Sequence, residues 1–159
     1  MVLVTHAVIG VALTTRIGNI LGSFLVGVVS HYIFDMVPHW HYPAPRLIKA
    51  VNTKPGTKSV TFTRQLFPDM VRVAIDLALG ISLSLIFFDA DMPVILAGAF
   101  GAVLPDLLAG SAKIWPLPPL VLHERIHRWI HTDIRIDNRH IIGISSQVLL
   151  IILFILLFS

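Results

Sequence analysis

The chain alternates long apolar runs with shorter polar segments, and the length of each run predicts the element that it forms. Residues 20–37 stay apolar for about 18 positions, and residues 69–88, 93–108 and 141–158 form comparable runs. A helix that crosses a bilayer needs about 20 consecutive, predominantly apolar residues. The pattern therefore predicts four membrane helices.

Two shorter segments complete the predicted architecture. Residues 2–15 are apolar, but three placements stay open for them: a thin span, a re-entrant segment or a helix beneath the others. Residues 120–132 follow the helix-breaking stretch Trp115-Pro-Leu-Pro-Pro119 and favour an interfacial helix. We expect an all-α integral membrane bundle of four to five membrane helices plus an interfacial helix, with residues 1–159 forming a single domain.

Composition supports the membrane class. The chain of 159 residues is 55% hydrophobic and 13% charged, about half the charged fraction of a soluble domain, and its mean hydropathy is +0.82. The net charge of +3 is modest, which gives little support to nucleic-acid binding. Because the chain has no cysteine, a zinc site must be built from histidine and carboxylate ligands.

The charges between the apolar runs predict the orientation of the bundle. Residues 42–66 carry five basic residues and no acid, and residues 111–140 carry five basic residues against three acids. The connection Asp89-Ala-Asp91 carries only negative charge. Under the positive-inside rule, both basic loops face the cytoplasm of a bacterial or archaeal type of membrane, and Asp89 faces outward.

Six of the eight histidines fall in two clusters, at residues 31–41 and 123–131. His31 and Asp35 are four residues apart, as are successive histidines of the second cluster, and this spacing places side chains on one face of a helix. Ionisable groups close to lipid are costly unless something pairs them. A divalent metal is the simplest such partner.

The predicted orientation brings the candidate ligands to one face of the membrane. The ends of the 20–37 and 93–108 runs, the start of the 69–88 run and the interfacial helix all lie on the cytoplasmic side. His6 joins them if the first segment starts inside. The predicted metal ligands are His6, His31, Asp35, Asp106, His127 and His131. The predicted proton carrier is Glu124 or Asp76.

Several of these residues have simpler interpretations. His31 and Asp35 fit a hydrogen bond that only fixes helix packing, and Asp106 fits a carboxylate that reaches water from a helix end. Asp76 follows Arg72 by one turn and fits a salt bridge. His39 stays open between a ligand and a solvated interfacial histidine, whereas for His41 the solvated interpretation is favoured.

The stretch His123-Glu-Arg-Ile-His127 matches the H-E-x-x-H pattern of zinc proteases. In those enzymes both histidines bind zinc and the glutamate activates water. The pattern continues here to a third histidine, His131, which a zinc protease of this type does not need. The alternatives are an intramembrane protease with Glu124 as its base, an amphipathic helix with Arg125 and Arg128 on lipid headgroups, and a metal site of another type.

Four short motifs carry a family resemblance. They are Thr5-His6, Ser30-His31-x-x-x-Asp35, Leu104-Pro105-Asp106 and His127-Arg-x-x-His131-Thr. With these motifs the chain resembles the membrane-bound metal-dependent hydrolases that include the YdjM-like inner-membrane proteins. Leu108 stands where that family often has a second aspartate, and Trp129 stands in place of a glycine. The resemblance implies hydrolysis as the reaction class, without naming a substrate.

The ligand types indicate the chemistry. Imidazoles and carboxylates without thiolate suit zinc, and also manganese or iron, as one or two ions. Such a site lowers the pKa of bound water and stabilises charge on a phosphoryl oxygen, while Lys113, Arg125 and Arg128 could hold a phosphate. Lipids and other amphiphiles reach the headgroup level most readily. The leading hypothesis is hydrolysis of a phosphoester in a membrane lipid or lipid-linked substrate. A non-enzymatic metal-binding or transport protein is a further alternative.

Overall fold

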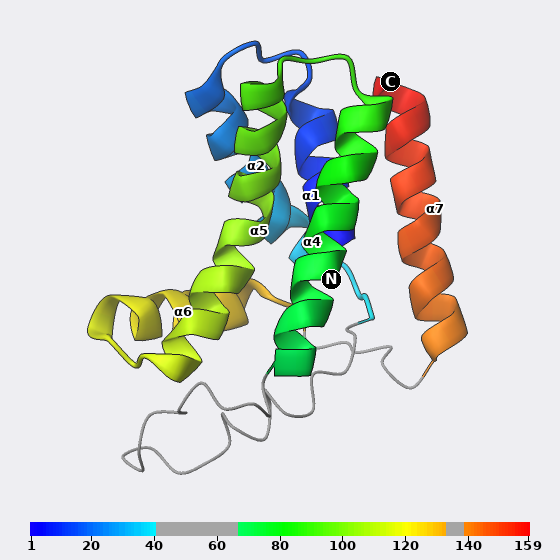
Figure 1. The fold of residues 1–159 in the computed structure, drawn as a ribbon. Coiled ribbons are helices and arrows are strands. Elements are labelled where there is room, and N and C mark those ends of the chain that lie inside the picture. Colours follow the sequence, from blue (N-terminus) through cyan, green and yellow to red (C-terminus); the bar gives the residue numbers. More distant parts are fainter. Residues whose placement is uncertain (41–66, 133–138) are drawn as a thin grey trace.

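The computed structural model describes residues 1–40, 67–132 and 139–159, without the side chains of residues 113–114. Within these residues the elements of secondary structure are all α-helices (Figure 1), which confirms the all-α prediction. The helices are α1 (Leu3–Thr14), α2 (Ile20–Asp35), α4 (Phe67–Phe87), α5 (Met92–Ile114), α6 (Pro118–Ile130) and α7 (His140–Phe158).

Most helix boundaries lie within two residues of the apolar runs, and α5 is the exception. It continues to Ile114, six residues beyond the end of the 93–108 run, with Pro105 inside it. The extension is packed rather than solvated, because Ala109 and Ala112 are both buried. Tertiary packing of this last stretch therefore outweighs the weaker apolar signal that ended the predicted helix.

Three of the described helices are long and apolar enough to cross a membrane: Phe67–Phe87, Met92–Ala112 and His140–Phe158. The apolar helices α1 and α2 have 12 and 16 residues, which corresponds to lengths of about 18 and 24 Å. Both are shorter than the hydrocarbon core of about 30 Å. The described helices indicate a membrane protein with three candidate spans, and the predicted count of four to five is not confirmed.

Helix α1 lies at the centre of the bundle. It is apolar all round, as expected of a buried helix, and all but Leu13 of its 12 residues are buried. Helices α2, α4, α5 and α7 all pack against it (Figure 1). The segment whose placement the sequence left open is therefore a short, buried helix surrounded by other helices.

Polar side chains from two candidate spans hold the start of α1. The first N–H groups of any helix lack partners within that helix. Here Asp76 of α4 accepts a hydrogen bond from the Leu3 N–H at 2.6 Å, and the Gln147 side-chain oxygen of α7 accepts one from the Val2 N–H at 3.0 Å. These contacts fix the depth of α1 and therefore the position of His6.

Glycines allow α2 and α5 to approach closely. A Cβ atom on Gly101 would collide with the backbone of Phe24, and one on Gly27 would collide with the carbonyl oxygen of Gly98. Small residues at such crossings let helix backbones come together inside membranes. This approach places the ring of His31 on α2 within hydrogen-bond distance of the Ala102 carbonyl on α5.

The outer surface of the bundle is apolar, and α6 lies across one end of it (Figure 1). Large exposed apolar side chains on the outer faces include Leu25, Ile75, Ile86, Leu149 and Leu156. Such a surface suits lipid rather than water. Trp129 on α6 is 85% exposed, and an exposed tryptophan at the end of a bundle is typical of a membrane interface.

Candidate metal centre

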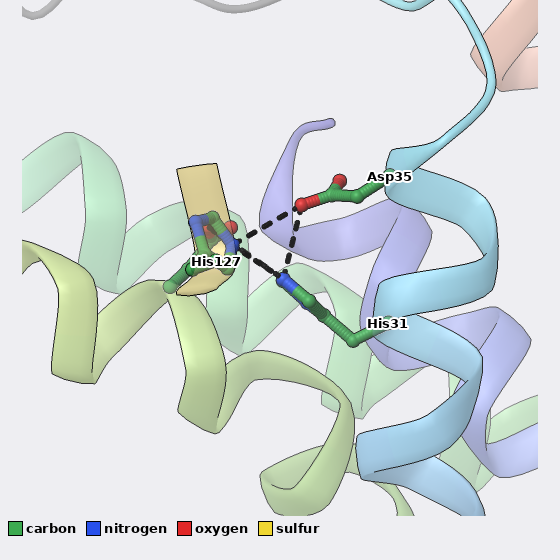
Figure 2. A group of neighbouring side chains, drawn as sticks. His31, Asp35 and His127 are labelled. Carbon is green, nitrogen blue, oxygen red and sulfur yellow. Dashed lines mark hydrogen bonds and ion pairs between the residues drawn. The ribbon is translucent and has the colours of Figure 1, made fainter. Parts of the chain in front are cut away.

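Side chains from three helices meet at the end of the bundle where α6 lies. His31 and Asp35 come from the last turns of α2, Asp106 from α5 and His127 from α6. Each offers one ligand atom, and the four atoms all lie within 4.8 Å of one another. Figure 2 shows the two imidazole rings and the Asp35 carboxylate pointing toward a common centre.

The separations between these atoms match a tetrahedral metal site. The Asp35 Oδ2 atom lies 3.1 Å from the His31 Nε2 atom and 3.3 Å from the His127 Nε2 atom. The Nε2 atoms of His31 and His127 are 3.0 Å apart. The Asp106 Oδ1 atom lies 3.4 Å from the His127 Nε2 atom and 3.8 Å from the His31 Nε2 atom. Zinc bonds of about 2.0–2.1 Å in a tetrahedron place neighbouring ligand atoms about 3.3–3.4 Å apart. The ligand types and their separations therefore suit a divalent metal ion.

A backbone carbonyl group on α5 fixes the orientation of the His31 ring. Its Nδ1 atom lies 2.7 Å from the carbonyl oxygen of Ala102, so Nδ1 carries the proton and donates it to that oxygen. The Nε2 atom then presents a lone pair to the site. This arrangement is the usual support of a metal-binding histidine, in which a carbonyl or carboxylate fixes the tautomer.

Burial gives the Asp35 carboxylate a strong need for a partner. Asp35 is 1% exposed, and its Oδ2 atom lies 3.3 Å from the His127 Nε2 atom, which can donate to it, and 3.1 Å from the His31 Nε2 atom, which presents a lone pair. A buried carboxylate is costly unless its charge is fully paired. The other oxygen, Oδ1, lies 3.4 Å from the amine of Met1. A cation at the centre of the four ligands would satisfy Oδ2.

Three further histidines surround the same carboxylate. The Nε2 atom of His6 lies 3.1 Å from Asp35 Oδ1, and its ring stacks on that of His31 with centroids 4.2 Å apart. The Nε2 atom of His39 lies 3.7 Å from Asp35 Oδ1, and the Nε2 atom of His131 lies 3.9 Å from Asp35 Oδ2. His6 and His131 thus lie beside Asp35 as expected but outside the four-residue group. The sequence left the role of His39 open between a ligand and a solvated histidine. Its position four residues after Asp35 was the feature that could have indicated a place beside this carboxylate.

The two predicted proton carriers lie outside the four-residue group. Glu124 forms an ion pair with Arg128, one turn further along α6. Asp76 accepts the hydrogen bond from the Leu3 N–H at the start of α1. Their catalytic roles stay predictions.

The H-E-x-x-H pattern is not assembled as a two-histidine zinc site. His127 points into the four-residue group, whereas the Nε2 atom of His123 lies 3.1 Å from the hydroxyl of Tyr32. Burial lowers the pKa of His123. A zinc protease of this type needs both histidines on one metal, so the geometry favours His127 alone as a ligand.

The charges around His127 affect its protonation, and therefore its ability to bind a metal. Burial opposes the charged form of this imidazole, but hydrogen bonds and charge attraction from Asp106 and Asp35 outweigh burial and raise the pKa of His127 to about 9. Without a metal, His127 therefore carries a proton at neutral pH. A metal that binds there must displace this proton.

We expect the apparent metal affinity to rise with pH for this reason. One displaced proton gives a gain that approaches about tenfold per pH unit well below the pKa of His127, and the gain levels off above about pH 9. Zinc titration with a competing chelator between about pH 6.5 and 9.5 measures it, once corrected for the pH dependence of the chelator. An affinity that stays flat over this range would contradict the assignment of His127 as a ligand.

Comparison with protein-family models, with curated proteins and with solved structures finds no match to this chain. The interpretation of the site therefore depends on its own geometry. His41 and most of the basic residues that predicted the orientation lie outside the described residues, and so does the side chain of Lys113.

Proposed function

We propose that this protein is a membrane-embedded, metal-dependent hydrolase that cleaves a phosphoester in a membrane lipid or lipid-linked substrate. The observation that carries the proposal is the group formed by His31, Asp35, Asp106 and His127. Their ligand atoms have near-tetrahedral separations, and the group lies in a bundle with an apolar outer surface. Zinc suits this ligand set best, and manganese or iron are alternatives.

The chemistry follows from the ligand set. A divalent metal at such a site supplies Lewis-acid charge to a phosphoryl oxygen and lowers the pKa of a water molecule. Asp106 is 30% exposed, whereas His31 and Asp35 are buried, so a substrate would approach from the Asp106 side. In the hydrolysis the water oxygen bonds to phosphorus, the ester P–O bond breaks, and the departing oxygen takes up a proton. Glu124 stays the proposed proton carrier, because Asp76 already holds the start of α1.

The membrane setting supports a lipid substrate at the cytoplasmic face. The positive-inside rule places the end of the bundle with the site in the cytoplasm. Arg125 precedes His127 by two residues, which is about 200° around the helix, and it is exposed. It is therefore better placed to contact lipid headgroups than a substrate at the metal. We further propose that α1 and α2 enter the bilayer with the three longer helices and give the four to five membrane helices.

Membership of the membrane-bound metal-dependent hydrolases is part of the proposal. The motifs that carry the resemblance lie far apart in the sequence. Their ionisable residues nevertheless gather around Asp35, as the distances to His6, His31, His127 and His131 show. Such convergence is expected if the motifs together form one site.

The transport alternative has less support from the described residues. In the three candidate spans, the ionisable residues lie in the half of each helix that is nearer the site. They are Asp69, Arg72 and Asp76 in α4, Asp106 in α5 and His140 in α7. A path for ions would need polar groups along the whole depth of the membrane.

The substitution Glu124→Gln separates the phosphoesterase from the protease alternative. A zinc protease depends on this glutamate to activate water, so its peptide cleavage would fall by at least about 100-fold. We expect Glu124→Gln to keep its metal, since Glu124 lies outside the four-residue group, and we expect neither the wild type nor the variant to cleave peptides. Metal content and cleavage of a casein substrate, measured on both proteins, give the comparison.

A direct assay of the proposed phosphoesterase activity measures phosphate release from phosphatidic acid and headgroup release from phosphatidylglycerol. The lipids are presented in detergent micelles with zinc or manganese. We expect turnover of one of these lipids by the wild type and loss of both metal and turnover in Asp106→Asn. Casein cleavage that Glu124→Gln abolishes would establish the protease instead. No turnover of either lipid by the metal-loaded wild type would contradict the phosphoesterase proposal.

A further inference from the structure

A second group of possible ligands lies next to the first and shares one residue with it. The ligand atoms of Asp35, His39 and His131 all lie within 4.8 Å of one another. Asp35 and His39 are buried, and His131 is partly exposed. The second group therefore has the same ligand chemistry as the first and shares the Asp35 carboxylate with it.

Both oxygens of Asp35 face imidazole nitrogens. Oδ2 lies 3.1 Å from the His31 Nε2 atom and 3.3 Å from that of His127, whereas Oδ1 lies 3.7 Å from the His39 Nε2 atom. The Nε2 atom of His131 lies 3.9 Å from Oδ2. A carboxylate whose two oxygens both face imidazoles can bridge two metal ions. Ions in two-metal hydrolytic centres are about 3.5–4 Å apart.

Backbone carbonyls orient both histidines of the second group. The Nδ1 atom of His39 lies 2.7 Å from the Val37 carbonyl oxygen, and that of His131 lies 2.9 Å from the Thr132 carbonyl oxygen. The Nδ1 atom of His31 uses the Ala102 carbonyl in the same way. In all three residues the Nε2 atom is directed toward Asp35. This is the support expected of a metal ligand, and a solvated interfacial histidine would not need it.

The backbone ties the two halves of the second group together. The N–H of Thr132, directly after His131, donates a hydrogen bond of 3.0 Å to the carbonyl oxygen of Asp35. The end of α6 is therefore joined to the end of α2 at the shared carboxylate. Asp35 itself is 1% exposed, and Nε2 atoms from both groups of ligands lie within 4.0 Å of its carboxylate.

We propose that Asp35, His39 and His131 hold a second divalent cation, so that Asp35 bridges a two-metal centre. The inference rests on the metal site of the proposed function and extends it. Three protein ligands leave a coordination position open for water or substrate, as in catalytic rather than structural sites. A pair of ions can stabilise both the attacking and the departing oxygen of a phosphoester, which deepens the preference for that substrate class.

The test is the number of metal ions per chain after saturation with Mn²⁺ and removal of excess, measured by mass spectrometry of the metal. We expect two ions in the wild type and one in the double variant His39→Ala/His131→Ala. The matched control is His140→Ala, which removes an exposed histidine outside both groups and should keep two. Mn²⁺ paramagnetic resonance of the wild type should show the multiline signal of two coupled ions, a readout that needs no variant.

One ion in the wild type, with no coupled signal, would overturn the second site while the first survives. A double variant that keeps both ions would overturn the ligand assignment. A wild type that binds no metal under any loading would overturn this inference and the proposed function together. These outcomes are distinct, so failure of the second site can be separated from failure of the first.

Discussion

Replacing Asp35 by asparagine is expected to abolish metal binding. Asp35 is the residue on which the cluster is centred, with its carboxylate within 4.0 Å of five histidines. Asparagine keeps the shape but removes the negative charge that offsets a cation and leaves only one oxygen. Loss of a supporting group around a metal typically costs 10- to 100-fold in affinity, and loss of a shared ligand should cost more than about 100-fold.

The experiment compares metal content and thermal unfolding of the purified variant with those of the wild type in detergent. Asp89→Asn is the matched control, because Asp89 is exposed and lies outside both groups of ligands. We expect the control to retain full metal content. An Asp35→Asn protein that is folded and holds as much metal as the wild type would exclude Asp35 as a ligand.

The second large effect is expected from Gly101→Ala, which should disturb the metal site by pushing α2 and α5 apart. The added methyl group would collide with the Phe24 backbone, and backbone cannot move aside as a flexible side chain can. Overpacking of this kind costs about 1–3 kcal/mol. The helices would have to separate, and the carbonyl of Ala102 would move away from His31. We therefore expect a lower unfolding temperature and a 10- to 100-fold lower metal affinity.

Gly110 on the same helix provides the matched control. A Cβ atom there would meet nothing within 4 Å, so Gly110→Ala should be neutral or stabilise α5 by up to about 1 kcal/mol. Thermal unfolding and zinc affinity of the two variants test the pair. Equal stability of Gly101→Ala and Gly110→Ala would show that the close approach of α2 and α5 is not required.

The sequence predicted the helices well but not how they pack. Apolar length alone places α2, α4 and α7, because a long apolar run has few alternatives to a helix in a membrane. The central position of α1 could not be derived, because a helix that is apolar on every side gives no indication of which face it buries. The glycine contacts at Gly27 and Gly101 also depend on which helices become neighbours, and this is not visible in a single sequence.

Convergence of the ligands was predictable in part. Four-residue spacing indicated the His31–Asp35 pair, and loop charge indicated that the candidates share one face of the membrane. Spacing alone could not separate His127, which enters the four-residue group, from His123, which contacts Tyr32. It also could not show that Asp76 is used to hold the start of α1, because that hydrogen bond joins residues far apart in the sequence.

The metal content of the wild-type protein, purified without chelator, tests the central claim most directly. The buried group of His31, Asp35, Asp106 and His127 predicts at least one tightly bound divalent ion per chain, with zinc the leading expectation. Asp35→Asn prepared in parallel gives the background. A wild type that is metal-free as purified, and that takes up no zinc, manganese or iron when these are supplied, would contradict the account.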